Sequence, residues 1–131
     1  MIEFSGGLYG EDKWNCFRES DLFILPTLNE NFGIVIAESL LSGTPVITCK
    51  GAPWPQLESE KCGWWVERNV ESIALAIMEA ISLSPIQLKQ MGLNGRRLAE
   101  NTYSDNVIAD RMKTLYEWIL GETEKPEFVY E

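Results

Sequence analysis

The chain has 131 residues, of which 45% are hydrophobic and 24% charged, and its formal net charge is −9. This size and composition are typical of one globular domain, or part of one, with a real core. No apolar run approaches the roughly 20 residues of a membrane span, the amino terminus lacks a signal-peptide layout, and the acidic balance argues against a nucleic-acid partner. We therefore expect a soluble, cytoplasmic protein that does not bind DNA or RNA.

The sequence contains no histidine and three cysteines, Cys16, Cys49 and Cys62. Without histidine there is no Ser-His-Asp or Cys-His arrangement, and the thiols lack the CxxC spacing of a zinc site. We expect all three thiols to be buried in a reducing compartment. Any chemistry must then use carboxylates, backbone amides or groups outside this chain, and a small anionic ligand stays compatible with the negative charge.

Short apolar runs alternate with longer amphipathic segments, which predicts β-α-β-α units around a parallel sheet and hence an α/β fold class. We expect strands at residues 2–4, 21–25, 45–48 and 63–66, and helices at about 11–19, 32–42, 70–83, from 85 onward and 104–121. The run at 21–25 is continuously apolar and stops at Pro26, as a strand buried on both faces does. We place a partial domain at residues 1–121 and a surface tail at 122–131.

Local signals set the ends of several helices. Asn31 is the expected N-cap of the helix at 32–42, and Gly43 is its stop. Ser84 and Gln87 have the spacing of a capping box with proline at the first helical position, and Ser104 is the expected cap of the last helix.

One segment carries a candidate ligand site. Glu30 lies in the loop after the strand at 21–25, and open α/β sheets bind ligands beyond the carboxyl ends of their strands. The backbone amides of Asn31, Phe32 and Gly33 follow at the helix start, where unpaired N–H groups and the helix dipole favour an anion. Glu38 lies roughly 10 Å from the helix start by the rise of 1.5 Å per residue. The pattern predicts a phosphate cradle between two carboxylates.

From Pro26 to Ile47 the sequence reads P-x3-E-x-F-G-x4-E-x4-G-x-P-V-I. This pattern resembles the E-x7-E donor-site motif of the group-one retaining glycosyltransferases, enzymes of two facing Rossmann-like domains known as the GT-B fold. The resemblance covers roughly residues 2–120, including 4–6, Lys13, 20–22 and 63–66. It implies a Rossmann-like parallel sheet with flanking helices, as a partial C-terminal domain of a GT-B enzyme.

The resemblance also implies roles for the site residues. Glu30 matches the catalytic first glutamate, which contacts donor-sugar hydroxyls and stabilises positive charge at the anomeric carbon. Glu38 matches the second, whose two oxygens accept hydrogen bonds from the ribose 2′- and 3′-hydroxyls. Asn31, Phe32 and Gly33 match the donor-binding loop that touches the sugar and phosphates. The family is generally metal-independent and retains the anomeric configuration, so we expect a nucleotide diphosphate sugar as substrate and no cofactor.

The sequence departs from the family in two places. In the family the first strands supply an Arg and a Lys to the leaving diphosphate, and from the resemblance we expect this segment before Ile2 and the acceptor domain to be missing here. We therefore expect a fragment that is inactive alone and either pairs its strands differently or dimerises through exposed strand edges. In the loop at 50–57, Trp54 and Gln56 replace the usual two glycines and glutamate, and Trp54 is a candidate to cover a base or sugar face.

By resemblance alone, the parent enzyme transfers a sugar to a glycan or lipid-linked acceptor hydroxyl in surface polysaccharide assembly, with peripheral membrane association. Each site residue also has a structural interpretation: Glu38 as a solvent-facing residue, and Glu30 as a charge at a helix N-terminus worth about 0.3–1 kcal/mol. Lys50 has two interpretations: it binds a phosphate, or it is a solvated lysine at the end of a strand. The alternative function is a non-catalytic α/β interaction or regulatory module derived from a donor domain.

Overall fold

The computed structural model describes residues 1–130, which form six α-helices and three β-strands. Along the chain these are α1 (Gly10–Glu19), β1 (Phe23–Leu25), α2 (Ile34–Ser42), β2 (Val46–Cys49), α3 (Gln56–Ser59), β3 (Gly63–Val66), α4 (Val70–Ser82), α5 (Pro85–Tyr103) and α6 (Asp105–Ile119). The strands are parallel in the order β1-β2-β3, with Phe23 beside Val46 and Val46 beside Gly63. The expected α/β class is confirmed.

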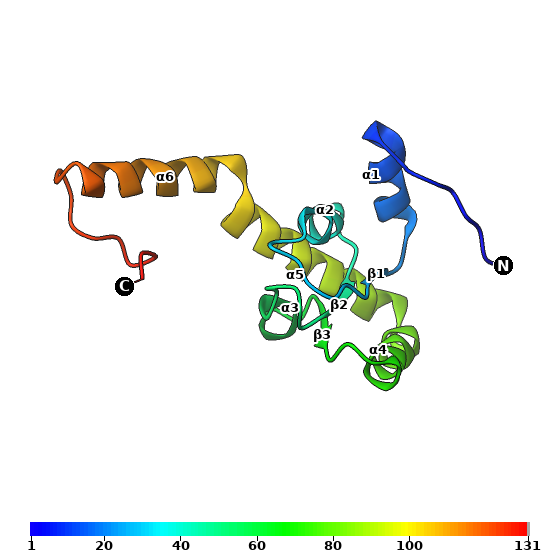
Figure 1. The fold of residues 1–131 in the computed structure, drawn as a ribbon. Helices are drawn as coiled ribbons and strands as arrows, with labels where there is room; N and C mark the ends of the chain where they lie inside the picture. The colour runs from blue at the N-terminus through cyan, green and yellow to red at the C-terminus, as the bar shows by residue number, and fades with distance from the viewer. Residues whose placement is uncertain (131) are drawn as a thin grey trace.

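Helices cover both faces of the sheet, because successive strand residues point to opposite faces. Val46 belongs to a core that α2, α3 and α5 complete, with Ile36 and Leu40 fully buried. Ile47, the next residue along β2, belongs to a second core with Ala76 of α4. In Figure 1, α2 and α4 accordingly lie on opposite sides of the strands.

Helix α5 packs closely across the end of α2. A Cβ atom on Gly92 would lie 2.0 Å from the carbonyl oxygen of Gly43, so the two backbones touch at that point. Arg96 Nε also donates a hydrogen bond of 2.9 Å to the carbonyl oxygen of Leu41. Gly43 has the left-handed φ of +83°, which confirms it as the stop of α2.

Near the amino terminus one strand prediction is wrong and another is confirmed only in part. Residues 1–9 form no regular element, and Ile2 and Phe4 are exposed, because no strand in the described chain lies beside residues 2–4. The run at 21–25 yields only the three residues of β1, and Ile24 is 37% exposed instead of buried. β1 is an edge strand within residues 1–130, and α4 packs mainly against β2 and β3.

Some of the predicted helix ends agree with the structure and others do not. α2 begins at Ile34, not at residue 32, and Gly33 stands at its N-cap in place of Asn31. The capping box of Ser84 and Gln87 is present, with proline directly after the cap. Ser104 stands at the N-cap of α6, but its side chain makes no capping hydrogen bond. The short helix α3 was not expected.

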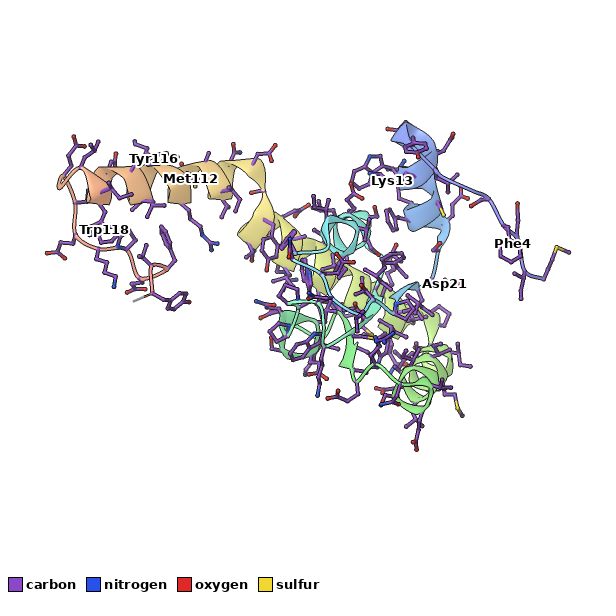
Figure 2. The ribbon with its side chains drawn as sticks, in the orientation of Figure 1. Phe4, Lys13, Asp21, Met112, Tyr116 and Trp118 are labelled. Atoms are coloured by element: carbon purple, nitrogen blue, oxygen red, sulfur yellow. The ribbon has the colours of Figure 1, made fainter. Side chains whose placement is uncertain are left out.

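Helix α6 extends away from the sheet, and the chain after it turns back beneath it (Figure 1). No residue of α6 is buried, and the side chains of Met112 and Tyr116 are largely exposed (Figure 2). Among residues 1–130, no single helix is long and apolar enough to cross a membrane, although α4 taken with α5 and α6, bent by 114°, reaches that length and composition.

The three thiols do not share one environment. Cys49 at the end of β2 and Cys62 before β3 are buried, as expected. Cys16 is exposed, so the expectation of burial is wrong there. It lies on α1, an amphipathic helix that turns Phe17, not Cys16, into the core.

Candidate functional site

Glu30 lies in the loop that joins β1 to α2, and neighbouring loop residues fix its backbone and its side chain. Its N–H donates a hydrogen bond of 3.1 Å to the carbonyl oxygen of Gly51 in the next loop of the sheet. The hydroxyl of Thr27 donates one of 3.1 Å to Glu30 Oε1. A Cβ on Gly51 would lie 2.0 Å from the carbonyl oxygen of Leu28, so the two loops touch backbone to backbone. Glu30 is thus positioned at the carboxyl end of the sheet, as predicted.

Four of the five predicted site residues line one depression. Its volume is about 430 Å³, and it is lined by Glu30, Asn31, Phe32, Gly33, Ile34 and Val35 at the start of α2. The N–H groups of residues 31–33 donate no hydrogen bond to another group within residues 1–130. Gly33 has the left-handed φ of +79°, which a residue with a side chain adopts only with strain. Unpaired amides at a helix start favour an anion.

The side chain of Phe32 points into the core, so the residue offers the depression mainly its backbone. Its ring centroid lies 5.1 Å from those of both Trp54 and Tyr103. Trp54 Nε1 donates a hydrogen bond to the carbonyl oxygen of Phe32. Trp54 is fully buried, so the expectation that it covers a base or sugar is wrong: this indole supports the loop from beneath. Burial also raises the pKa of Tyr103 above its ordinary value, although Arg111 acts in the opposite direction.

Glu38, the fifth predicted residue, does not line the depression. It lies further along α2, with a side chain 17% exposed, and its Oε1 is 2.6 Å from Nζ of Lys13 on α1. A half-buried carboxylate needs such a partner, because a buried charge without compensation is costly. Lys13 is labelled in Figure 2, on the helix beside α2. The sequence had marked Lys13 by family resemblance, but not as the partner of Glu38.

Two further residues of the loops and strands have defined partners. Lys50, after β2, forms an ion pair of 2.8 Å with Glu67, and its ammonium lies 5.8 Å from the ring centroid of Trp65. Glu67 raises the pKa of Lys50, first by the hydrogen bond and then by its charge. Trp64 packs against Ala76 and Ala80 of α4. Lys50 thus has its partners in β3 and in the residue after it.

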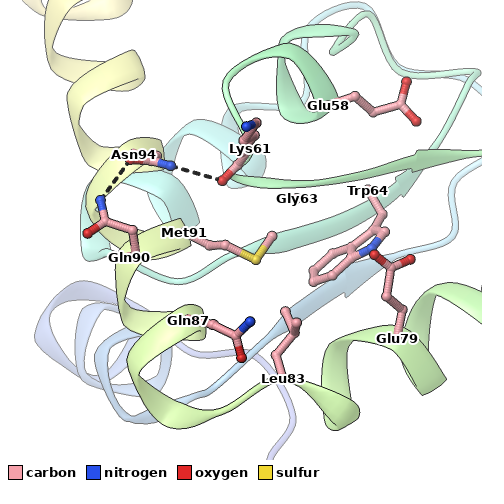
Figure 3. A pocket seen from close by; sticks show the side chains of 10 residues that line it. All are labelled: Glu58, Lys61, Gly63, Trp64, Glu79, Leu83, Gln87, Gln90, Met91 and Asn94. Carbon is pink, nitrogen blue, oxygen red and sulfur yellow. Dashed lines mark hydrogen bonds between the residues drawn. The ribbon is translucent and has the colours of Figure 1, made fainter.

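A second depression, of about 530 Å³, lies beside the start of β3 (Figure 3). Trp64, Leu83 and Met91 form its apolar part, while Gln90 and Asn94 line its rim. Asn94 donates a hydrogen bond of 3.2 Å to the carbonyl oxygen of Lys61, drawn as a dashed line in Figure 3. None of the predicted site residues lines this depression, because they lie at the carboxyl end of β1 and along α2.

The sheet, the covering helices and the loop site are those of a Rossmann-like α/β domain. The chain belongs to the family described as glycosyl transferases group 1, whose model matches residues 1–98.

Individual relatives agree with this membership. The chain is 25% identical over 120 residues to the MMP alpha-(1->4)-mannosyltransferase of Mycolicibacterium hassiacum, covering 89% of this chain and 29% of that protein. It is 30% identical over 116 residues to the capsular polysaccharide biosynthesis glycosyltransferase CapM of Staphylococcus aureus, covering 86% and 30%. The chain therefore spans about three tenths of the length of these curated relatives.

A solved structure supports the fold. Sucrose-phosphate synthase from Thermosynechococcus elongatus superposes with a TM-score of 0.71 at 24% identity, covering 82% of this chain and 27% of that chain. At this identity the likeness is evidence for the fold alone.

Proposed function

We propose that this chain is the donor-nucleotide-binding part of a retaining glycosyltransferase that moves a sugar from a nucleotide diphosphate sugar to an acceptor hydroxyl. One observation carries the proposal: Glu30 and the unpaired amides of residues 31–33 line one depression at the start of α2. Glu38 follows on the same helix. Family membership and the names of the relatives support sugar transfer.

The depression suits the diphosphate of the donor. Backbone N–H groups at the start of α2 point their dipoles at an anion without any basic side chain, and Gly33 leaves room for a phosphate oxygen to approach. Such fixed donors stabilise the charge that develops on the departing diphosphate, and they need no reorganisation during the reaction. The backbone amides thus attract an anion at this one place, although the net charge of the whole chain is −9.

The two glutamates bind opposite ends of the donor: Glu30 contacts the sugar and Glu38 contacts the ribose. Glu30 accepts hydrogen bonds from the sugar hydroxyls and stabilises positive charge at the anomeric carbon. Thr27 occupies one oxygen of its carboxylate and holds the side chain in place. Glu38 accepts from the two vicinal ribose hydroxyls, for which a carboxylate offers two acceptor oxygens. The transfer is proposed to need no metal ion.

The acceptor belongs to the rest of the parent enzyme. We assign it to a glycan or a lipid-linked glycan, because one relative is named for capsular polysaccharide biosynthesis. Surface polysaccharide assembly, a cytoplasmic location and peripheral contact of the parent with a membrane are parts of the same proposal. The 131-residue chain alone is expected to bind donor weakly and to transfer no sugar.

The test is a titration of UDP-, GDP- and ADP-sugars into the isotopically labelled chain, followed by the amide resonances of residues 31–33 and 38. We expect saturable shifts for one base class, which would also name the nucleotide. A folded chain with no shift for any of the three would overturn donor binding by this fragment and favour the non-catalytic interaction module.

Replacing Glu38 gives the first specific prediction. Glu38→Gln removes the charged acceptor of the ribose hydroxyls, and hydrogen bonds to charged groups are worth about 1.5–3 kcal/mol. We expect the affinity for the bound nucleotide to fall by roughly 10- to 100-fold in the same titration. The control is Glu117→Gln on α6, because Glu117 is also a half-buried helical glutamate paired with a lysine, Lys113, at 3.7 Å. Equal affinity in wild type and Glu38→Gln would contradict the assigned role.

A further inference from the structure

The ion pair of Lys13 and Glu38 joins α1 to the middle of α2. Lys13 Nζ lies 2.6 Å from Glu38 Oε1, and the two side chains are 32% and 17% exposed. Many ion pairs on protein surfaces lie in open solvent and contribute little. This pair is half-buried, short, and formed by residues 25 positions apart in the chain. It is therefore part of the tertiary structure.

Helix α1 is itself held firmly, so the position of Lys13 is fixed by the fold. Phe17 is buried and meets the ring of Phe23 edge to face, with centroids 5.3 Å apart. The hydroxyl of the buried Thr44 donates a hydrogen bond to the carbonyl oxygen of Phe17. The ammonium of Lys13 also lies 5.1 Å from the ring centroid of Trp14. These contacts fix the backbone of α1 and so place Lys13 beside Glu38.

We infer that Lys13 is a positioning residue for ribose recognition: it holds the Glu38 carboxylate in the orientation that accepts both ribose hydroxyls. This inference rests on the proposed function. The ammonium contacts Oε1 alone, so Oε2 and the remaining lone pair of Oε1 stay available to a vicinal diol. Without the lysine, the glutamate side chain must lose its rotational freedom when the ligand binds, which weakens binding.

The lysine also removes an electrostatic obstacle. A nucleotide diphosphate is an anion, and an uncompensated carboxylate on α2 would repel it. The ammonium at 2.6 Å compensates that charge locally, and it leaves the hydrogen-bonding capacity of the carboxylate in place. Lys13 is thus expected to act on the ribose end of the donor, not on the sugar end that Glu30 contacts.

The test uses the whole 131-residue chain and the nucleoside diphosphate that the wild type binds among UDP, GDP and ADP, together with its 2′-deoxy form. Lys13→Met should lower the affinity for the ribonucleotide by about tenfold, because the retained Glu38 carboxylate must then be ordered when the ligand binds. It should change the affinity for the 2′-deoxynucleotide much less. Lys13→Arg, which keeps the charge, should restore most of the ribonucleotide affinity.

A matched control and a double variant separate positioning from general destabilisation. Lys113→Met removes a lysine of the other helical Lys–Glu pair and should leave both affinities unchanged. In a Glu38→Gln background, Lys13→Met should have no further effect, because its partner is already gone. If Lys13→Met does not fold, Lys13→Gln gives the same comparison with a shorter polar side chain.

The outcomes distinguish a failure of the proposed function from a failure of the role of Lys13. A wild type that binds no nucleotide overturns the proposed function and this inference together. A wild type that prefers the ribonucleotide while Lys13→Met keeps both its affinity and that preference overturns the role of Lys13 alone. A loss in Lys13→Met that is equal for the ribo- and deoxynucleotides, or that Lys13→Arg does not repair, also overturns it.

Discussion

Gly51 fixes the position of Glu30, although it lies in a different loop. Its carbonyl oxygen accepts the Glu30 N–H at 3.1 Å, and a Cβ at this position would lie 2.0 Å from the carbonyl oxygen of Leu28. We expect Gly51→Ala to force the two loops apart, because backbone atoms cannot move aside as a flexible side chain can. The free energy of unfolding should fall by roughly 1–3 kcal/mol, as measured by urea denaturation.

The same substitution should shift the amide resonance of Glu30 and weaken the proposed binding of the donor. Gly7→Ala is the control, because a Cβ there would meet only the flexible side chain of Tyr9. Its effect on stability should stay within about 0.5 kcal/mol. A Gly51→Ala chain with wild-type stability and an unshifted Glu30 resonance would show that the contact between the loops is not restrictive.

At this scale the sequence predicted contiguous features and missed distant contacts. Glu30 and the amides of residues 31–33 are neighbours in the chain, so a loop followed by a helix brings them to one depression. The partner of Glu38 is 25 residues away, and no local pattern pairs the two. Trp54 was a candidate ligand contact because aromatic rings commonly stack on bases and sugars, but its buried position depends on packing with Phe32 and Tyr103.

At the scale of elements, two serines at helix starts allow a direct comparison. The Ser84 hydroxyl accepts a hydrogen bond from the N–H of Gln87, whereas Ser104 makes no side-chain cap bond. We expect Ser84→Ala to lower the free energy of unfolding by about 1 kcal/mol, and Ser104→Ala to lower it much less. Thermal and urea unfolding of the two variants measure the difference. Equal losses would mean that the Ser84 cap adds nothing beyond the general cost of removing a hydroxyl.

Elements whose ends are marked by local residues were predicted closely, whereas strands whose formation depends on a partner strand were not. The strand at 63–66 and the stop of α2 at Gly43 follow from short runs and from glycine chemistry. The apolar residues 2–4 resemble a strand equally well, but a strand forms only beside another, and none lies there in residues 1–130. The exposed Ile24 has the same origin, because β1 borders no further strand in the described chain.

At the scale of the whole molecule, the two cores explain why so short a sheet holds its shape. Val46 and Ile47 of β2 point to opposite faces, and each is almost fully buried under helices. The strands on either side of β2 are edges within residues 1–130. Dimerisation through such edges stays a prediction, and unpaired edge groups give it a physical basis.

The buried thiols couple the stability of the whole chain to pH. Burial is the main cause that raises the pKa of Cys62 from 9.0 to about 12, and burial also raises that of Cys49. In the unfolded chain both thiols lose their protons near the ordinary value. Between about pH 9 and pH 12 the Cys62 thiol therefore keeps its proton in the folded state and loses it in the unfolded state, so stability must fall as the pH rises through that window.

This linkage predicts that the free energy of unfolding falls by up to about 1.4 kcal/mol per pH unit for each thiol that is protonated only in the folded state. Urea unfolding at several pH values from 8 to 11 measures it. Tyrosines and lysines titrate in the same range, so the informative quantity is the difference between wild type and Cys62→Ala. We expect the variant, although less stable at pH 8, to lose stability less steeply as the pH rises. Parallel curves for wild type and Cys62→Ala would mean that the Cys62 thiol ionises as readily in the folded chain as in the unfolded one.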